Sequence, residues 1–195
     1  MEHDRFPDAT STAVSSTDEQ LLLDYLNGAP AAFAAIVERH ENRLARIAFR
    51  IIGCRSEAED ARHAVFVRFL QLCESQPRQF TRVGAWLTRC TVNEAISRVR
   101  KQNREGRVRA EFATLVPAAG ISSPSEQVEA EESRERLSIA LAELSPDARA
   151  ILSLRFDEDL TFREIAVLLD RPPSTVKSQL AKAIAQLRDL LGAAN

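Results

Sequence analysis

The stretch that most constrains the fold is residues 160–191, where two helical patterns are separated by a very short break. Thr161 and Glu164 have the spacing of a capping box, so a helix is expected to begin there. Asp170 tolerates a left-handed turn, and Pro173 can serve as the first residue of the next helix. The stretch therefore predicts a helix-turn-helix, although the motif alone also fits an ordinary helical hairpin.

The second helix of this stretch, with the turn before it, carries polar and cationic side chains opposite its apolar residues. Such hydroxyl, amide, guanidinium and ammonium groups donate hydrogen bonds to phosphates and base edges. We therefore assign this surface to duplex DNA. The candidate contacts are Arg171, Ser174, Thr175, Lys177, Ser178, Gln179 and Lys182.

The composition favours helix over strand, because Ala, Leu, Arg and Glu dominate while glycine and aromatic residues are scarce. We expect a soluble, all-α protein of two small helical domains joined by a flexible linker, the C-terminal one containing the helix-turn-helix. The formal net charge of −2 does not by itself indicate a nucleic-acid-binding protein. Any such function requires local clusters of basic residues.

Cysteine and histidine give no sign of a metal or redox site. Cys54, Cys73 and Cys90 are widely spaced and odd in number, which favours free, buried thiols. No histidine has neighbours at ligand spacing, so we expect no metal and no cofactor. No nucleophile–base arrangement accompanies the acidic residues, so no catalytic residue and no enzyme activity are expected. The absence of a secretion signal or a long apolar run predicts a cytoplasmic protein without membrane insertion.

The order of patterns along the chain predicts its domain boundaries. We expect a disordered tail over residues 1–16, a helical domain over 17–104, a linker over 105–127 and the helix-turn-helix domain over 128–195. In the first domain a helix beginning at Pro30 is expected to stop at Gly53. The next helix is expected to open at a second capping box formed by Ser56 and Glu59. Ser145-Pro146 predicts the start of a further helix.

Basic residues are concentrated in RVRKQNREGRVR, residues 98–109, where Glu105 is the one acidic residue. This helix end is predicted to be a local electropositive site for nucleic acid. Trp86 lies at the start of the same expected helix. Packing in the core is the favoured role for Trp86, and stacking on DNA is the alternative.

The segments resemble, in collinear order, the extracytoplasmic-function (ECF) group of bacterial RNA polymerase sigma factors. The resemblance rests on FAAIVERHENRLARIAFRIIG, EAEDARHAVFVRFL and AWLTRCTVNEAISRVRKQ, followed by LSPDARAILSLRF and LTFREIAVLLDRPPSTVKSQL. It covers nearly the whole chain after the tail. It implies a region-2-like domain that binds core polymerase and melts the minus-ten element. It also implies a region-4-like domain that recognises the minus-35 element.

The resemblance also assigns roles to particular residues. It implies that one helix docks on the polymerase through Asp60, Arg62, His63 and Arg68. It implies that a loop and the basic helix after it hold the unpaired minus-ten strand, through bases captured by polar edges and stacking surfaces. These strand contacts would be Arg78, Gln79, Phe80, Arg89, Asn93, Arg98, Arg100 and Lys101. For the linker, the resemblance implies a path toward the polymerase active-centre cleft, and a solvated spacer is the alternative.

Two departures from the family pattern qualify these roles. Family members usually have Gln-Glu where this chain has His63-Ala64, and a basic pattern where it has Gln179, Ala181 and Ile184. The second change predicts fewer phosphate contacts and a weaker dependence of DNA binding on salt. We expect a sigma factor whose partners are core RNA polymerase, promoter DNA and an anti-sigma factor. The alternative is a degenerate relative that acts by sequestering a protein.

Overall fold

The computed structural model describes residues 16–75, 80, 82–105 and 124–192, and every regular element among them is an α-helix. The helices are α1 (Asp18–Leu26), α2 (Pro30–Ile52), α3 (Arg55–Ser75), α4 (Val83–Arg104), α5 (Pro124–Ala142), α6 (Pro146–Phe156), α7 (Phe162–Leu169) and α8 (Pro173–Gly192). This confirms the all-α prediction. Within the described ranges no helix is both long and apolar enough to span a bilayer.

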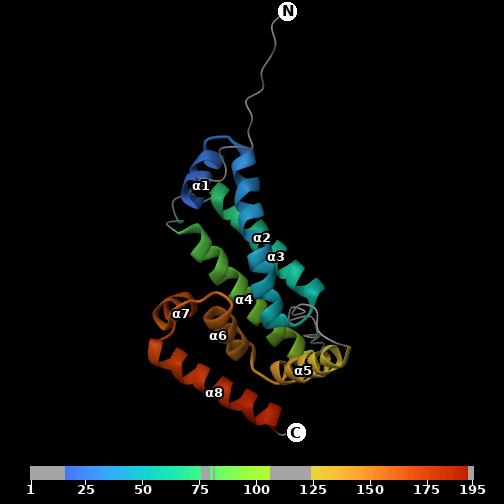
Figure 1. Cartoon of the computed structure of the whole chain (residues 1–195). Coiled ribbons are helices and arrows are strands. Elements are labelled where there is room, and N and C mark those ends of the chain that lie inside the picture. The colour runs from blue at the N-terminus through green and yellow to red at the C-terminus, as the bar shows by residue number, and fades with distance from the viewer. Residues whose placement is uncertain (1–15, 76–79, 81, 106–123, 193–195) are drawn as a thin grey trace, which may run out of the picture.

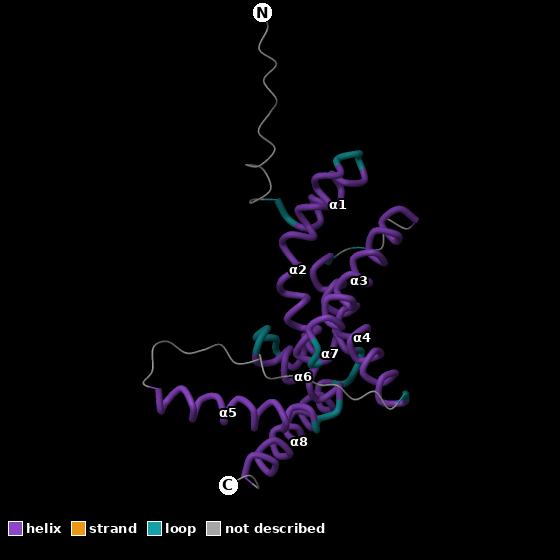
Figure 2. The backbone as a smooth tube through the Cα atoms, turned by 90° about the vertical axis from the view of Figure 1, so that its right-hand side faces the viewer, coloured by secondary structure: helices purple, strands orange, loops and turns teal. Residues whose placement is uncertain are grey.

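The helices form two groups that pack against each other (Figure 1). In the first helical group, α1 to α4, the long α2 contacts α1, α3 and α4. The second helical group consists of α5 to α8, with α6 and α5 both packed on α8. The two groups meet where α6 contacts α2 and α4, and where α7 contacts α4. Figure 2 shows the second group from another side, with α5 and α8 at the end of the molecule away from the N-terminus.

The amphipathic pattern of α2 explains its central position. Its side chains Ile36, Leu44, Ile47 and Ile51 are almost fully buried. Each such burial stabilises the fold by roughly 1.5–3 kcal/mol, before the loss of conformational entropy is considered. The helix ends at Gly53, as predicted, with φ at 80°, a left-handed conformation that glycine adopts without strain.

The predicted helix ends around the helix-turn-helix are confirmed. The hydroxyl of Thr161 accepts a hydrogen bond from the Glu164 amide at 3.3 Å, and the Glu164 carboxylate accepts from the Thr161 amide at 2.8 Å. Asp170 ends α7 in a left-handed conformation with φ at 54°. Pro173 is the first residue of α8, and Ser145 caps α6.

The predicted capping box at Ser56 is wrong. The amide of Ala58 already donates to the carbonyl of Cys54, so helical hydrogen bonding begins before Ser56. Helix α3 therefore starts at Arg55, and Glu59 pairs with the Arg55 side chain at 3.4 Å instead of capping the helix. The spacing of a capping box therefore does not by itself determine where a helix begins. Here the helix starts one residue earlier, directly after the turn that ends α2.

Other boundaries differ by about a turn from those expected. Helix α4 begins at Val83 and not at Trp86, and it ends at Arg104. Helix α5 begins at Pro124, inside the stretch assigned to the linker. The expected tail and most of the expected linker lie outside the described residues.

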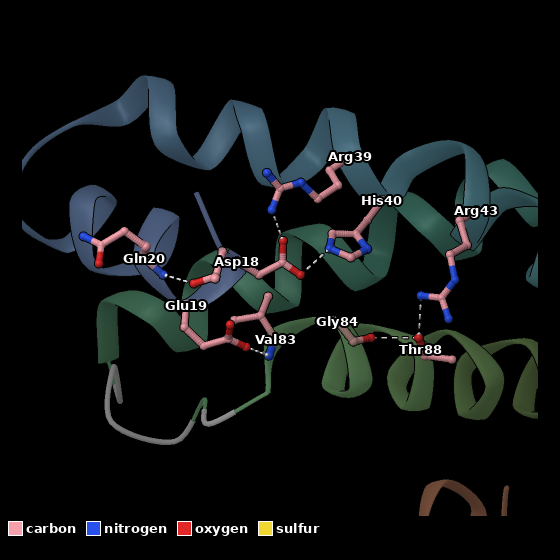
Figure 3. A network of polar contacts seen from close by, with 10 residues as sticks. Asp18, Glu19, Gln20, Arg39, His40, Arg43, Val83, Gly84 and Thr88 are labelled. Atoms are coloured by element: carbon pink, nitrogen blue, oxygen red, sulfur yellow. Dashed lines mark hydrogen bonds and ion pairs between the residues drawn. The ribbon is translucent and has the colours of Figure 1, made fainter. Parts of the chain in front are cut away.

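A partly buried polar network attaches α1 to α2 (Figure 3). The Asp18 carboxylate accepts a hydrogen bond from Nη1 of Arg39 at 2.6 Å, and Nε2 of His40 lies 2.7 Å from its other oxygen. Burial alone would raise the pKa of Asp18. The hydrogen bonds from Arg39 and His40 outweigh that effect, so the pKa is lowered from its ordinary value of 3.8.

The same network holds the beginning of α4. The carboxylate of Glu19 accepts a hydrogen bond from the backbone amide of Val83 at 3.1 Å. Gly84 follows, and a methyl group on its Cα would lie 3.2 Å from the ring of His40 and 3.3 Å from Asp18. Glycine at this position therefore lets α4 approach the network closely. Helix α1 thus fixes the point at which the chain enters α4.

We expect Asp18→Asn to lower the thermal midpoint of unfolding at pH 7, and to lower it progressively less as the pH falls below the ordinary carboxyl pKa of 3.8. A carboxylate with a depressed folded-state pKa stabilises the fold above its unfolded pKa, and this stabilisation disappears as pH falls through the folded pKa. Circular dichroism melts between pH 3 and 7 measure the difference. Asp24→Asn is the control, because Asp24 bonds to Gln20 on its own helix. An equal destabilisation at both pH values would contradict the role of the ionised carboxylate.

Candidate nucleic-acid interface

A groove of about 550 Å³ lies between α3 and α4. Its side chains include two guanidinium groups, one amide, one indole and one hydroxyl beside an apolar floor. The lining residues are Ala64, Val65, Arg68, Leu72, Trp86, Arg89, Cys90, Asn93, Glu94 and Ser97. A groove of this composition combines stacking surface, hydrogen-bond donors and positive charge, which is the chemistry that holds an unpaired base and its phosphate.

The helical repeat of α4 brings the polar side of this groove together. Arg89, Asn93 and Ser97 follow one another at a spacing of four residues, so they lie on one face of the helix. All three are exposed. Arg68 enters from α3 and is exposed too, so the groove contains a residue that the sequence had assigned to polymerase docking. The regular spacing along α4 would have allowed Ser97 to be predicted, whereas the contribution of Arg68 depends on how α3 packs.

Aromatic residues form the wall between the groove and the core. Trp86 is half-buried, and its ring centroid lies 5.5 Å from that of Phe69 and 5.1 Å from that of Phe80. Trp86 therefore packs against the core, as the favoured interpretation of the sequence expected. It also lines the groove, where the half-buried indole remains partly accessible. The sulfur of Cys90 lies nearby, and burial raises the pKa of its thiol.

The ring of Phe80 is not accessible for stacking on a base. Its side chain is only 8% exposed and packs edge-on against Phe69 and Trp86. The expectation of an exposed stacking ring failed because an aromatic residue in a polar loop gains more from burial than from solvent exposure. Arg78 and Gln79, the other candidates in this loop, lie outside the described residues.

The basic end of α4 is less uniform than its sequence suggests. Arg98, which we expected to be exposed, is half-buried, with ion pairs to Glu94 at 2.7 Å and to Glu57 at 3.4 Å. Its guanidinium group therefore braces α4 against α3. Arg100 and Lys101 are exposed, as expected of strand contacts.

The helix-turn-helix presents the second candidate surface. The exposed residues of its first turns on α8 are Ser174, Lys177 and Ser178, and Lys182 follows one turn later. Thr175 and Gln179 are half-buried. The ammonium group of Lys177 lies 5.5 Å from the ring centre of Phe162 on α7, so part of its charge already faces an aromatic ring.

Arg171, in the turn between α7 and α8, has two partners. Its guanidinium group donates to Oε1 of Gln179 at 2.9 Å and also to the carboxylate of Asp147 on α6. That carboxylate accepts a second hydrogen bond, from Nη2 of Arg100, at 2.7 Å. Burial alone would raise the pKa of Asp147. The two guanidinium groups outweigh this effect and lower the pKa.

The residues assigned to polymerase docking lie along α3. Asp60 and His63 are exposed, and Arg62 is half-buried with its Nη1 3.0 Å from the carboxylate of Glu41 on α2. The carboxylate of Asp60 and the imidazole of His63 are therefore exposed on the surface of α3. Arg62 instead connects α3 to α2. Arg68, two turns further along, lies at the groove.

Metal chemistry has no support among the described residues, where no three histidine, cysteine or carboxylate side chains gather at a common point. The three cysteines are free thiols. Cys73 is buried, and burial raises the pKa of its thiol to about 11, so it is neutral at physiological pH.

Two family models match the segments that contain these candidate surfaces. The model described as Sigma-70 region 2 matches residues 36–105, which include α3, α4 and their groove. The model described as Sigma-70, region 4 matches residues 140–189, which include the helix-turn-helix. Together the two segments make up more than half of the chain. The chain belongs to the sigma-70 family of RNA polymerase sigma factors.

Within this family the similar proteins are of the ECF group, as the sequence predicted. The chain is 33% identical over 163 residues to the ECF RNA polymerase sigma factor SigE of Mycolicibacterium smegmatis, an alignment covering 80% of this chain and 60% of that protein. It is 27% identical over 170 residues to the ECF RNA polymerase sigma factor SigW of Bacillus subtilis, covering 82% of this chain and 89% of SigW.

Solved structures share the fold. The sigma factor RpoE from Bartonella quintana, solved with the anti-sigma factor NepR, aligns with a TM-score of 0.60 at 22% identity, over 82% of this chain and 96% of RpoE. CnrH, solved with the cytosolic domain of CnrY, aligns with a TM-score of 0.59 at 21% identity, over 91% of this chain and 99% of CnrH.

We expect Phe80→Ala to destabilise the protein by about 3 kcal/mol, because the truncation leaves a cavity between two aromatic rings. Urea unfolding followed by tryptophan fluorescence and circular dichroism measures the loss. Phe156→Ala is the control, since Phe156 is 62% exposed and its truncation should be nearly neutral. Wild-type stability of Phe80→Ala together with lost binding of single-stranded DNA would instead support the stacking role.

Proposed function

We propose that this chain is an ECF-type sigma factor that binds core RNA polymerase, directs it to specific promoters and helps to open them. The observation that carries the proposal is the groove between α3 and α4. It brings positive charge, an amide and an indole together inside the segment that matches Sigma-70 region 2. The protein acts by binding and not by catalysis. Because its partners are the polymerase and the chromosome, its place of action is the cytoplasm.

The groove is proposed to hold a base that has left the duplex at the minus-ten element. The accessible edge of Trp86 provides a stacking surface, and the amide of Asn93 provides a donor and an acceptor for a base edge. Arg68 and Arg89 stand on opposite sides of the groove and bind the flanking phosphates. Trapping an unpaired base in this way lowers the free energy of the melted promoter relative to the duplex.

The upstream element is proposed to lie against the first turns of α8. A recognition helix enters the major groove with its N-terminal residues at the base edges. Ser174 and Ser178 have exposed hydroxyl groups at these turns, and Lys177 and Lys182 supply phosphate contacts. With few cations on this face, binding should show a shallow dependence on salt.

Helix α3 is proposed to dock on core polymerase through the exposed Asp60 and His63, with Arg62 between them. The docking domain is residues 17–104 and the upstream-element domain is residues 128–195. RpoE was solved in complex with the anti-sigma factor NepR, and CnrH in complex with the cytosolic domain of CnrY. We infer that an anti-sigma factor also holds this chain inactive. The alternative of a degenerate relative that acts only by sequestration is not favoured, because the relatives along both halves carry sigma-factor names.

The direct test is run-off transcription with core RNA polymerase, the purified chain and a library of genomic fragments from the host. We expect discrete transcripts that depend on the chain and that start downstream of a shared sequence element. Core polymerase alone and core with the heat-denatured chain are the controls. The absence of any chain-dependent transcript, with folded protein and active core, would overturn the proposed function.

A second prediction concerns the groove. Arg89→Ala and Asn93→Ala should each lower run-off transcription roughly tenfold, because each removes a contact to the unpaired strand worth a few kcal/mol at most. Folding should be unchanged, since both side chains are exposed. Arg55→Ala is the matched control for lost positive charge, as Arg55 is 86% exposed and far along α3 from the groove. A pre-melted promoter should partly rescue both groove variants, and equal loss on duplex and pre-melted templates would argue against strand capture.

A further inference from the structure

A cleft of about 530 Å³ lies between α4 and α7, and no role proposed above makes use of it. Figure 1 shows α7 beside the first half of α4. The volume falls within the range of about 300–1,000 Å³ that is typical of small-molecule sites. The cleft is therefore large enough for a ligand with an apolar body and one polar group.

The floor of the cleft is apolar. The half-buried side chains of Trp86, Leu160 and Leu168 pack against the core cluster and also line the cleft. Val167 lines it from α7 and is 76% exposed, so little of its side chain is used in packing within the chain. An apolar group bound here would remove this surface from water, which is favourable.

The margin of the cleft is positively charged. Four guanidinium groups and one carboxylate line it, those of Arg43, Arg82, Arg89, Arg163 and Glu164. Two of the guanidinium groups already have acidic partners. That of Arg43 pairs with Glu158, and that of Arg89 lies 3.9 Å from the carboxylate of Asp170.

The other two arginines are available to a ligand. Arg82 and Arg163 are exposed, and within the described ranges neither forms an ion pair. The nearby carboxylate of Glu164 is held by the amide and the hydroxyl of Thr161. These hydrogen bonds lower the pKa of Glu164, and the charge of Arg82 lowers it further. Glu164 therefore offsets part of the charge of Arg82, whereas Arg163 on α7 keeps its full charge for an anion.

An apolar floor with guanidinium groups at its margin fits one class of ligand, a small amphipathic acid. Guanidinium groups bind acidic oxygens through paired N–H donors. A neutral apolar molecule would leave these donors unused, and a wholly polar anion would leave the floor in water. Both parts of the cleft are satisfied only when the acidic group and the apolar body belong to the same molecule.

Two residues connect this cleft to the groove between α3 and α4. Trp86 and Arg89 line both hollows, and they are the only residues that the two have in common. They are three positions apart on α4, so their side chains are neighbours on the helix surface. A ligand in the cleft therefore contacts the indole and the guanidinium group that are proposed to hold the unpaired strand.

We propose that the cleft between α4 and α7 binds a small amphipathic acid, and that this ligand competes with the unpaired promoter strand for Trp86 and Arg89. The acidic group binds Arg163, with Arg82 adding to the positive field, and the apolar body covers Val167 and the floor. Binding of the acid does not depend on the role of the groove. The competition rests on the proposed function, because it assumes that the groove holds the strand.

The first test titrates the full-length chain with octanoate, below the concentration at which octanoate forms micelles. Trp86 is the only tryptophan of the chain, so its fluorescence reports on the cleft directly. We expect saturable binding of octanoate. Octanol and acetate should each bind about tenfold more weakly or less, because octanol lacks the charge and acetate lacks the apolar body. Equally tight binding of octanol would mean that the cleft only buries apolar surface, as a contact with another protein does, and would overturn the proposal.

Arg163→Ala should weaken octanoate binding about tenfold, because it removes the unpaired guanidinium group. Val167→Glu should weaken it similarly, by placing a second carboxylate at the wall. Both side chains are exposed, so folding should be preserved. Arg188→Ala is the matched control, since it removes an exposed guanidinium group from α8 outside the cleft. Unchanged affinity of Arg163→Ala or Val167→Glu, or an equal loss in Arg188→Ala, would contradict the site.

The second test measures the competition. Saturating octanoate should weaken the binding of a fluorescein-labelled single strand about fivefold, followed by anisotropy, and the strand should weaken octanoate binding by the same factor. Arg163→Ala should bind the strand as the wild type does and lose most of this response. An unchanged strand affinity of the wild type in octanoate would overturn the competition.

These measurements separate the ligand site from the proposed function. The octanoate titration needs neither DNA nor polymerase, whereas run-off transcription needs both. Octanoate binding that depends on Arg163, with no chain-dependent transcript, would support the ligand site and count against the sigma activity. Chain-dependent transcripts with no octanoate binding would overturn the ligand site and leave the proposed function intact.

Discussion

The rest of the structure depends on the burial of one face of α2. Ile36, Leu44, Ile47 and Ile51 are almost fully buried, and the helix contacts α1, α3, α4 and also α6 of the second group. One continuous apolar cluster therefore includes residues of both groups, with Ile151 on α6 among them. Separating the groups exposes apolar surface and costs free energy. The ion pairs between the groups, such as Arg50 with Asp157 and Arg100 with Asp147, add to that cost.

Features that depend on a few neighbouring residues were predictable from the sequence. The cap at Thr161, the left-handed turn at Asp170 and the stop at Gly53 each follow from the chemistry of a side chain acting on its own backbone. The helical repeat also placed Arg89 and Asn93 on one face. The Ser56 cap failed because α3 already begins at Arg55, with the Ala58 amide donating to the Cys54 carbonyl, so Ser56 lies inside the first turn.

Features that depend on how helices pack were not predictable. Phe80 read as an exposed loop residue because the two rings that bury it, Phe69 and Trp86, belong to other parts of the fold. The sequence suggested that Arg98 is an unpaired cation, because one of its partners, Glu57, lies on another helix. Arg43 and Glu158 are 115 positions apart, and no periodicity in the sequence links them. Local signals therefore indicated candidate DNA-binding surfaces, but they did not reveal that the two helical groups pack against each other.

The arrangement of charge reconciles a net charge of −2 with binding to DNA. Affinity for DNA depends on the arginines and lysines that reach phosphates, not on the sum over the chain. Arginines of the first group pair with acids of the second, which keeps the net charge low and leaves cations such as Lys101, Lys177 and Lys182 exposed. The proposed affinity for promoter DNA therefore depends on these exposed cations and on the groove between α3 and α4, and not on the overall charge of the chain.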